Sequence, residues 1–126
     1  MKNIITSFIL FLTMLTGQSI NWATSFDGAG NDFISDMSTD NSGNTYVVGQ
    51  FGADITVNGT TYSPQGVQDM FWAKIGSDGS VNYFHHIEGS GDERGRGIDV
   101  DDMGNIYIFG RFSESLFINS GTVVYT

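Results

Sequence analysis

The sequence predicts an all-β fold in which one unit of short strands occurs twice in tandem, with a period of 61 residues. Three observations predict it. Two stretches align without a gap at that offset, and no segment keeps a helical spacing of apolar residues over three turns. Glycine is abundant (17 residues) and aromatic residues reach 13%, whereas proline occurs once. Aromatic segments punctuated by glycine are typical of short strands joined by tight turns.

The two copies retain turn residues and strand residues at separate positions. The copy that begins at Ser19 reads SINWATSFDGAGNDFISDMSTDNSGNTYVVGQF, and the copy that begins at Ser80 reads SVNYFHHIEGSGDERGRGIDVDDMGNIYIFGRF. The identical positions are mostly Gly, Asn and Asp, which form turns. The conservatively replaced positions are apolar and favour strands. Chance does not sort residues in this way, so we infer an internal duplication.

Each copy contains four or five strand candidates with hairpin-length connections. Residues 44–51 and 105–112 are apolar without alternation, which is typical of strands covered on both faces. Each follows an Asp-x-x-Gly-Asn stretch, in which Asp accepts backbone hydrogen bonds and Gly takes the positive φ of a tight turn. The other candidates span residues 34–39, 54–57, 70–75, 81–87 and 97–100.

A unit of about 60 residues with about four antiparallel strands matches one blade of a β-propeller. A blade has two apolar faces, which only neighbouring blades can cover. The sequence thus divides into a leader (residues 1–18), a first unit (19–79) and a second, incomplete unit (80–126). Because a propeller needs about four to eight blades, we expect the chain to be a fragment. The alternative is a short protein whose copies associate into a ring.

The first 18 residues have the order of a secretory signal peptide. Lys2 precedes an apolar run over residues 4–15, and small polar residues follow it. These 12 positions are fewer than the roughly 20 needed to span a bilayer. We therefore expect export, with an uncleaved anchor or a buried strand as alternatives. The chain has no cysteine, which excludes disulfides, thiolate metal sites and a lipid-bearing cysteine.

The charge of the chain excludes two classes of partner. The formal net charge is −9, with 14 acidic and 5 basic residues. Nucleic acids and anionic membrane surfaces both require clusters of Lys and Arg. We therefore expect no nucleic-acid partner and no membrane insertion of the mature chain. Solvation of an extracellular surface explains the acidity, and calcium binding is the alternative.

Candidate binding residues lie where the two copies differ. His85 and His86 are adjacent, so on a strand they face opposite ways and cannot both ligate one ion. A charge cluster follows them on a loop, where a binding contact and simple solvation are both open interpretations. The candidate ligand-binding residues are His85, His86, Asp92, Glu93, Arg94 and Arg96.

Three aspartates surround one of the predicted turns, and they are the candidate metal ligands: Asp99, Asp101 and Asp102. Carboxylate oxygens at close spacing can hold calcium, which is the one candidate cofactor. The twelve-residue calcium loop with its closing Glu is absent, and turn capping explains the same residues without a metal.

Several motifs follow one another in a fixed order. Residues 40–51 read DNSGNTYVVGQF, residues 66–74 read GVQDMFWAK, and residues 79–83 read GSVNY. This order resembles the bacterial seven-bladed β-propeller (SBBP) repeat family, whose core is D-x-x-G-N-x-Y-V-x-G-x-F. In the second motif Asp stands one place later than in the family, and Tyr83 replaces the usual Trp. The resemblance implies a secreted or outer-surface bacterial protein and brings no set of catalytic residues.

These observations together predict a secreted or cell-surface propeller repeat protein that binds a protein or glycan as a non-catalytic scaffold. No nucleophile elbow or dinucleotide fingerprint occurs, and nothing singles out a carboxylate pair, so we do not expect an enzyme. The alternatives are an extracellular propeller enzyme that acts on polysaccharide and a calcium-dependent adhesin. Further blades in cis, or self-association, are the expected partners of the units themselves.

Overall fold

The computed structural model describes residues 19–26 and 28–117, which contain strands and no helix. The all-β prediction is therefore confirmed for this part of the chain. The predicted leader lies outside the described residues. The strands are β1 (Phe33–Thr39), β2 (Thr45–Phe51), β3 (Ile55–Val57), β4 (Thr60–Tyr62), β5 (Asp69–Ile75), β6 (Val81–Gly89), β7 (Arg94–Val100), β8 (Ile106–Arg111) and β9 (Leu116–Phe117).

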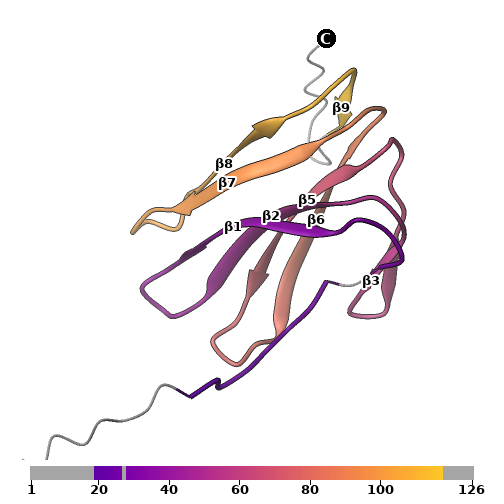
Figure 1. The fold of residues 1–126 in the computed structure, drawn as a ribbon. Coiled ribbons are helices and arrows are strands. Elements are labelled where there is room, and N and C mark those ends of the chain that lie inside the picture. The colour runs from indigo at the N-terminus through magenta and orange to yellow at the C-terminus, as the bar shows by residue number, and fades with distance from the viewer. Residues whose placement is uncertain (1–18, 27, 118–126) are drawn as a thin grey trace, which may run out of the picture.

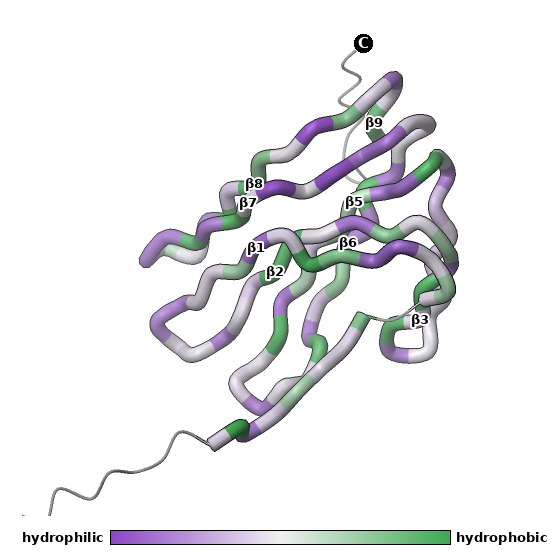
Figure 2. The backbone as a smooth tube through the Cα atoms, viewed as in Figure 1, coloured by the Kyte–Doolittle hydropathy of each residue, from purple (hydrophilic) through white to green (hydrophobic). Residues whose placement is uncertain are grey.

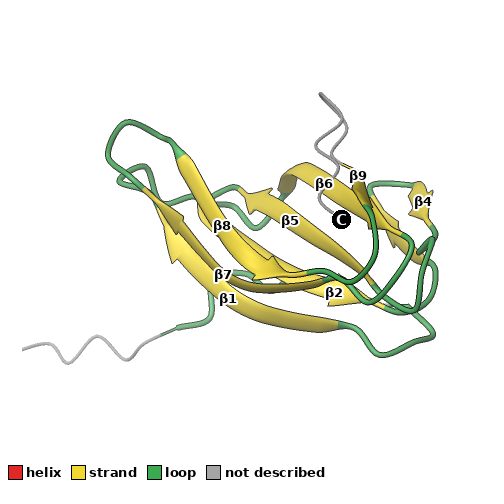
Figure 3. Cartoon of the chain, turned by 90° about the horizontal axis from the view of Figure 1, so that it is seen from above, coloured by secondary structure: helices red, strands yellow, loops and turns green. Residues whose placement is uncertain are grey.

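The strands form open antiparallel sheets. The largest has the order β1-β2-β5-β6-β9 (Figure 1), and β3 pairs with β4 in a small hairpin. We call β1–β2 the first hairpin and β7–β8 the second hairpin. The second hairpin packs on one face of the large sheet, over β1 and β2, as the view from above shows (Figure 3).

Strand β2 lies at the centre of the fold, and all its residues are buried. Its side chains alternate between two apolar cores. Val47 and Phe51 pack with β3 and β5 on one face, whereas Tyr46 and Val48 pack against β7 on the other. Figure 2 shows apolar segments running through these inner strands. The predicted covering of this strand on both faces is confirmed.

Strand β8 is covered on one face only within the described residues. Ile106 and Ile108 pack against the core that contains Tyr46 and Val48. The intervening Tyr107 is 58% exposed. The predicted covering on both faces is therefore wrong for β8 within the described residues, because its second face contacts solvent.

The first and second hairpins have the same arrangement of paired residues. Phe33 pairs with Gln50 in the first and Arg94 with Arg111 in the second. Every paired position of the second hairpin lies 61 residues after a paired position of the first, and both have a bulge at the same place. The backbone geometry of the two hairpins thus follows one pattern, although many side chains differ.

An aspartate clamps the turn of each hairpin. Oδ1 of Asp40 accepts the backbone N–H groups of Ser42 and Asn44, each at 2.9 Å. Its Oδ2 accepts the Asn44 side-chain amide at 2.7 Å and the Tyr46 hydroxyl at 3.2 Å. Asp101 accepts the same four bonds from the corresponding residues of its own turn. These bonds, the one from the Asn side chain first, hold the pKa of both carboxyl groups below the usual value.

Candidate functional site

Several loops that connect the strands gather at one end of the large sheet. Strand β5 pairs antiparallel with β2 and with β6, so β2 and β6 end where β5 begins. The short loop at residues 90–93 then leads from β6 into β7. An isolated bridge between Gln68 and Asp92 joins two of these loops, and the N–H of Glu93 donates to the Gln68 carbonyl at 3.0 Å. We call this end, with the strand residues that border it, the loop end (residues 52–54, 63–68, 90–96 and 111–115).

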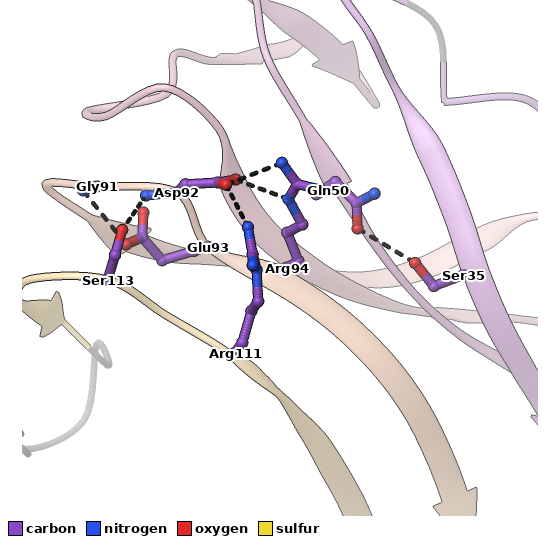
Figure 4. Close-up of polar contacts among 8 residues, drawn as sticks. All are labelled: Ser35, Gln50, Gly91, Asp92, Glu93, Arg94, Arg111 and Ser113. Atoms are coloured by element: carbon purple, nitrogen blue, oxygen red, sulfur yellow. Dashed lines mark hydrogen bonds and ion pairs between the residues drawn. The ribbon is translucent and has the colours of Figure 1, made fainter.

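Asp92 holds two arginines at the loop end (Figure 4). Nε and Nη2 of Arg94 donate to its two oxygens, both at 2.8 Å, and Nη2 of Arg111 donates to Oδ2 at 2.6 Å. The bond from Arg94 is the main cause of a lowered pKa of Asp92, and it raises the pKa of Arg94. Bidentate pairing fixes the Arg94 guanidinium. The Arg111 side chain is 57% exposed, so it presents its remaining donors to solvent.

Arg96 extends this cationic surface along β7. It is exposed and lies at the bulge, where its counterpart in the first hairpin is Ser35. The Ser35 hydroxyl donates to the Gln50 side chain at 3.1 Å, and Gln50 is the counterpart of Arg111. Ser35 and Gln50, which are neutral and hydrogen-bonded to each other in the first hairpin, are thus replaced by arginines in the second. Within residues 19–26 and 28–117, the Arg96 side chain makes no hydrogen bond or ion pair.

The sequence prediction omits Arg111, although a signal for it was present. Three of the five basic residues of the whole chain lie at this place: Arg94, Arg96 and Arg111. The replacement of Gln50 by a charged residue at the corresponding position is the difference that identifies it. A comparison of the two copies beyond the loop itself therefore reveals the site.

Glu93 lies in the interior, beneath the surface that its charged neighbours form. It is fully buried, and Oε1 accepts the Gly91 N–H at 3.2 Å, whereas Oε2 has no hydrogen-bond partner in the described part of the chain. Burial, and then the charge of Asp69, raise the pKa of Glu93. Its counterpart Asp32 also accepts backbone N–H groups of two loops. We therefore interpret Glu93 as a residue that holds the loop in place through hydrogen bonds, and not as a ligand contact.

The raised pKa of Glu93 gives a prediction on pH. The folded state favours the neutral acid, so its contribution to stability is present below the unfolded pKa of about 4.3 and is lost as pH rises through the folded value. Glu93→Gln stays neutral and retains one oxygen acceptor. We expect it to raise the melting temperature relative to wild type more at pH 7 than at pH 4. Glu114→Gln, at an exposed site, is the control; an advantage independent of pH would contradict the prediction.

The two histidines point toward different cores. Nε2 of His86 lies 2.6 Å from Oδ2 of Asp69, and both side chains are buried. Asp69 also accepts the backbone N–H of Gln65 at 3.0 Å. His85 lies beside the Trp72 ring, and burial, followed by the charge of His86, lowers the pKa of His85. His86 thus has a structural partner, whereas His85 is partly buried and lines a pocket that Arg111 also lines.

The three candidate calcium ligands lie at the opposite end of the sheet, around the turn of the second hairpin. Asp99 accepts the Ser38 hydroxyl at 3.0 Å, and Asp102 accepts the Asn41 amide at 2.9 Å. Asp101 is occupied by its own turn. In the described ranges, no three His, Asp or Glu side chains are grouped as a metal site requires. Calcium binding stays a prediction from the sequence.

Comparison with known proteins adds no assignment. No protein-family model matches the chain, and a search of curated proteins gives no match. Among the described residues, no helix has the length and hydropathy to cross a membrane. The function therefore has to be inferred from the loop end and from the relation between the two hairpins.

Proposed function

We propose that this protein is a secreted or cell-surface β-propeller repeat protein that binds a protein or glycan at its loop end without catalysis. One observation carries the proposal: the two hairpins share register, bulge and turn clamp, but their side chains at the loop end differ. A constant frame with unit-specific surface residues is characteristic of repeat proteins that bind through loops.

The packing of the hairpins supports the propeller part of the proposal. Strands β1, β2, β5 and β6 form a four-stranded antiparallel unit, and the second hairpin stacks on its face with the pairing of the first. Propeller blades stack in this way, and each blade covers the apolar face of the next. The predicted leader supports export, and the motif order supports the SBBP resemblance.

The chemistry of the loop end supports binding of an anionic group. Arg96 and Arg111 present guanidinium donors on a chain that is otherwise acidic. Guanidinium groups recognise carboxylates through paired hydrogen bonds. The two loop acids do not offer an acid–base pair for glycoside hydrolysis, because Asp92 is bonded to two arginines and Glu93 is buried. We therefore favour a ligand that carries carboxylates, in a glycan or a protein.

The test replaces the site with the residues of the first hairpin. Arg96→Ser with Arg111→Gln introduces the counterparts Ser35 and Gln50, which the same backbone already carries. On an array of acidic and neutral glycans and acidic peptides, we expect wild type to bind acidic members. The double variant should bind roughly tenfold more weakly, since hydrogen bonds to charged groups contribute about 1.5–3 kcal/mol. Lys74→Gln, on β5, is the matched control.

Two results would contradict the proposal. Equal binding by wild type and the double variant would exclude the arginines as the contact. Release of reducing ends from a polysaccharide by the purified protein, with multiple turnovers, would exclude the non-catalytic part.

A further inference from the structure

An aromatic pair on the second hairpin is exposed at positions that are buried in the first. Tyr46 and Val48 of β2 face the second hairpin and are 4% and 0% exposed. Their counterparts on β8, Tyr107 and Phe109, are 58% and 69% exposed. Large apolar side chains that cluster on one exposed face mark an interaction surface. In the first hairpin, the corresponding face is covered by the second hairpin.

The outer face of the first hairpin is the complementary half of that contact. Met37 of β1 is 60% exposed, whereas its counterpart Ile98 on β7 is 5% exposed and packs at the internal contact. Beside Met37 lies a largely apolar groove of about 340 Å³ between the segment before β1, which contributes Trp22 and Phe26, and the first hairpin. Thr45 and Val47 line its base and are themselves buried. Their counterparts Ile106 and Ile108 are the β8 residues that pack at the internal contact. The groove thus lies where Tyr107 and Phe109 of a second copy would fit.

Polar pairs at the rim indicate which surface fits. Within the chain, Ser38 donates to Asp99 and Asn41 donates to Asp102, so counterpart positions face each other across the contact. A second copy that presents its first hairpin would bring Ser38 and Asn41 opposite Asp99 and Asp102. The Ser38 hydroxyl already donates to its own Asp99, so the second N–H of the Asn41 amide is the donor that can reach Asp102 of the other copy. If the second copy presented its second hairpin instead, aspartates would face aspartates, and like-charge repulsion disfavours that arrangement.

We propose that the outer face of the second hairpin binds the outer face of the first hairpin of a second copy of this chain. The arrangement is head to tail and repeats the contact that joins the two hairpins within one copy. The proposal adds a partner to the proposed function and relies on the equivalence of the two hairpins. It does not depend on the loop-end ligand.

Single cysteines test the contact, because the chain contains no other cysteine. Ser38→Cys and Asp99→Cys are made in separate chains, mixed and oxidised. We expect a disulfide-linked dimer in the mixture and little in either variant alone. A chain that carries both substitutions should close the bond internally, since Ser38 Oγ and Asp99 Oδ1 are 3.0 Å apart. Closure in this control without dimer in the mixture would overturn the proposal, as would equal dimer from either variant alone.

Complementation in analytical ultracentrifugation tests the direction of the contact. Phe109→Lys damages one face and Met37→Lys the other, so each variant alone should associate at least about tenfold more weakly than wild type. Mixed together, they should form a dimer, because each retains the face that the other lacks. Thr60→Lys is the control, as Thr60 is exposed on the small β3–β4 hairpin, outside both proposed surfaces.

The result separates this proposal from the loop-end function. Monomeric wild type at all concentrations, or a mixture that stays monomeric, would overturn the head-to-tail contact. Binding of acidic ligands by monomeric Phe109→Lys would support the proposed function independently of the contact between copies. Head-to-tail dimers that bind no acidic ligand would support the contact and contradict the proposed function.

Discussion

Asp69→Ala is expected to lower the free energy of unfolding by about 2–6 kcal/mol, because two donors lose their acceptor and each unsatisfied buried group costs about 1–3 kcal/mol. Asp69 is fully buried, and its carboxylate accepts bonds from His86 at 2.6 Å and from the backbone N–H of Gln65. Without it, a buried imidazole and a backbone donor lose their acceptor. The loss should also loosen the loop that enters β5.

Urea unfolding of wild type and variant measures this effect. Asp69→Asn should lose less, because its amide oxygen still accepts one bond. Asp54→Ala removes an exposed carboxylate from the segment before β3 and should change stability by no more than about 0.5 kcal/mol. A loss below about 1 kcal/mol for Asp69→Ala would show that the pair with His86 does not stabilise the fold.

Gly49→Ala is expected to cost about 3 kcal/mol, at the upper end of the range for overpacking. Gly49 lies on β2 opposite the bulge of β1, and a Cβ there would overlap the carbonyl oxygen of Phe33. A backbone oxygen held in a strand pair cannot rotate away as a side chain does. The first hairpin would therefore have to separate at its bulge, which also disturbs both apolar cores of β2.

Gly59→Ala separates this overlap from backbone strain. Gly59 has a φ of 78° and no atom near the site of a Cβ, so its replacement costs only the strain of about 1 kcal/mol. Gly110→Ala repeats the overlap in the second hairpin, against the carbonyl of Arg94. We expect it to cost less than Gly49→Ala, since that hairpin is covered on one face. Equal losses for Gly49→Ala and Gly59→Ala in thermal melts would contradict the steric argument.

The sequence predicts the strands well where local signals agree. Residues 44–51 correspond to β2, because the apolar run and the clamped turn before it both favour a strand there. β7 was expected from residue 97 and begins at Arg94. Two arginines and a glycine at its start carry little strand propensity, so the pairing with β8 determines the strand. The short strand β4 (Thr60–Tyr62) was not predicted, since three residues give no period.

The sequence identifies part of the candidate site. Comparison of the copies singled out Asp92, Arg94 and Arg96 as unit-specific, but charge alone does not separate a surface residue from a buried one. Glu93 is buried because Gly89 leaves room for its carboxyl group, where a Cβ would overlap it. That contact joins β6 to the loop after it and depends on how the chain turns there. The expected export and calcium binding stay predictions.

The turn clamps have a consequence for the order of folding. The side-chain hydrogen bonds of Asp40 join residues no more than 6 positions apart, so closure of the first hairpin costs little chain entropy. Hairpins of this kind form in about 1–10 μs. Pairing of β2 with β5 must close a longer loop, which contains the small hairpin β3–β4, so it is expected to form later. Each hairpin is thus expected to form first and to serve as a template, so that a chain emerging from the ribosome assembles from its amino-terminal end.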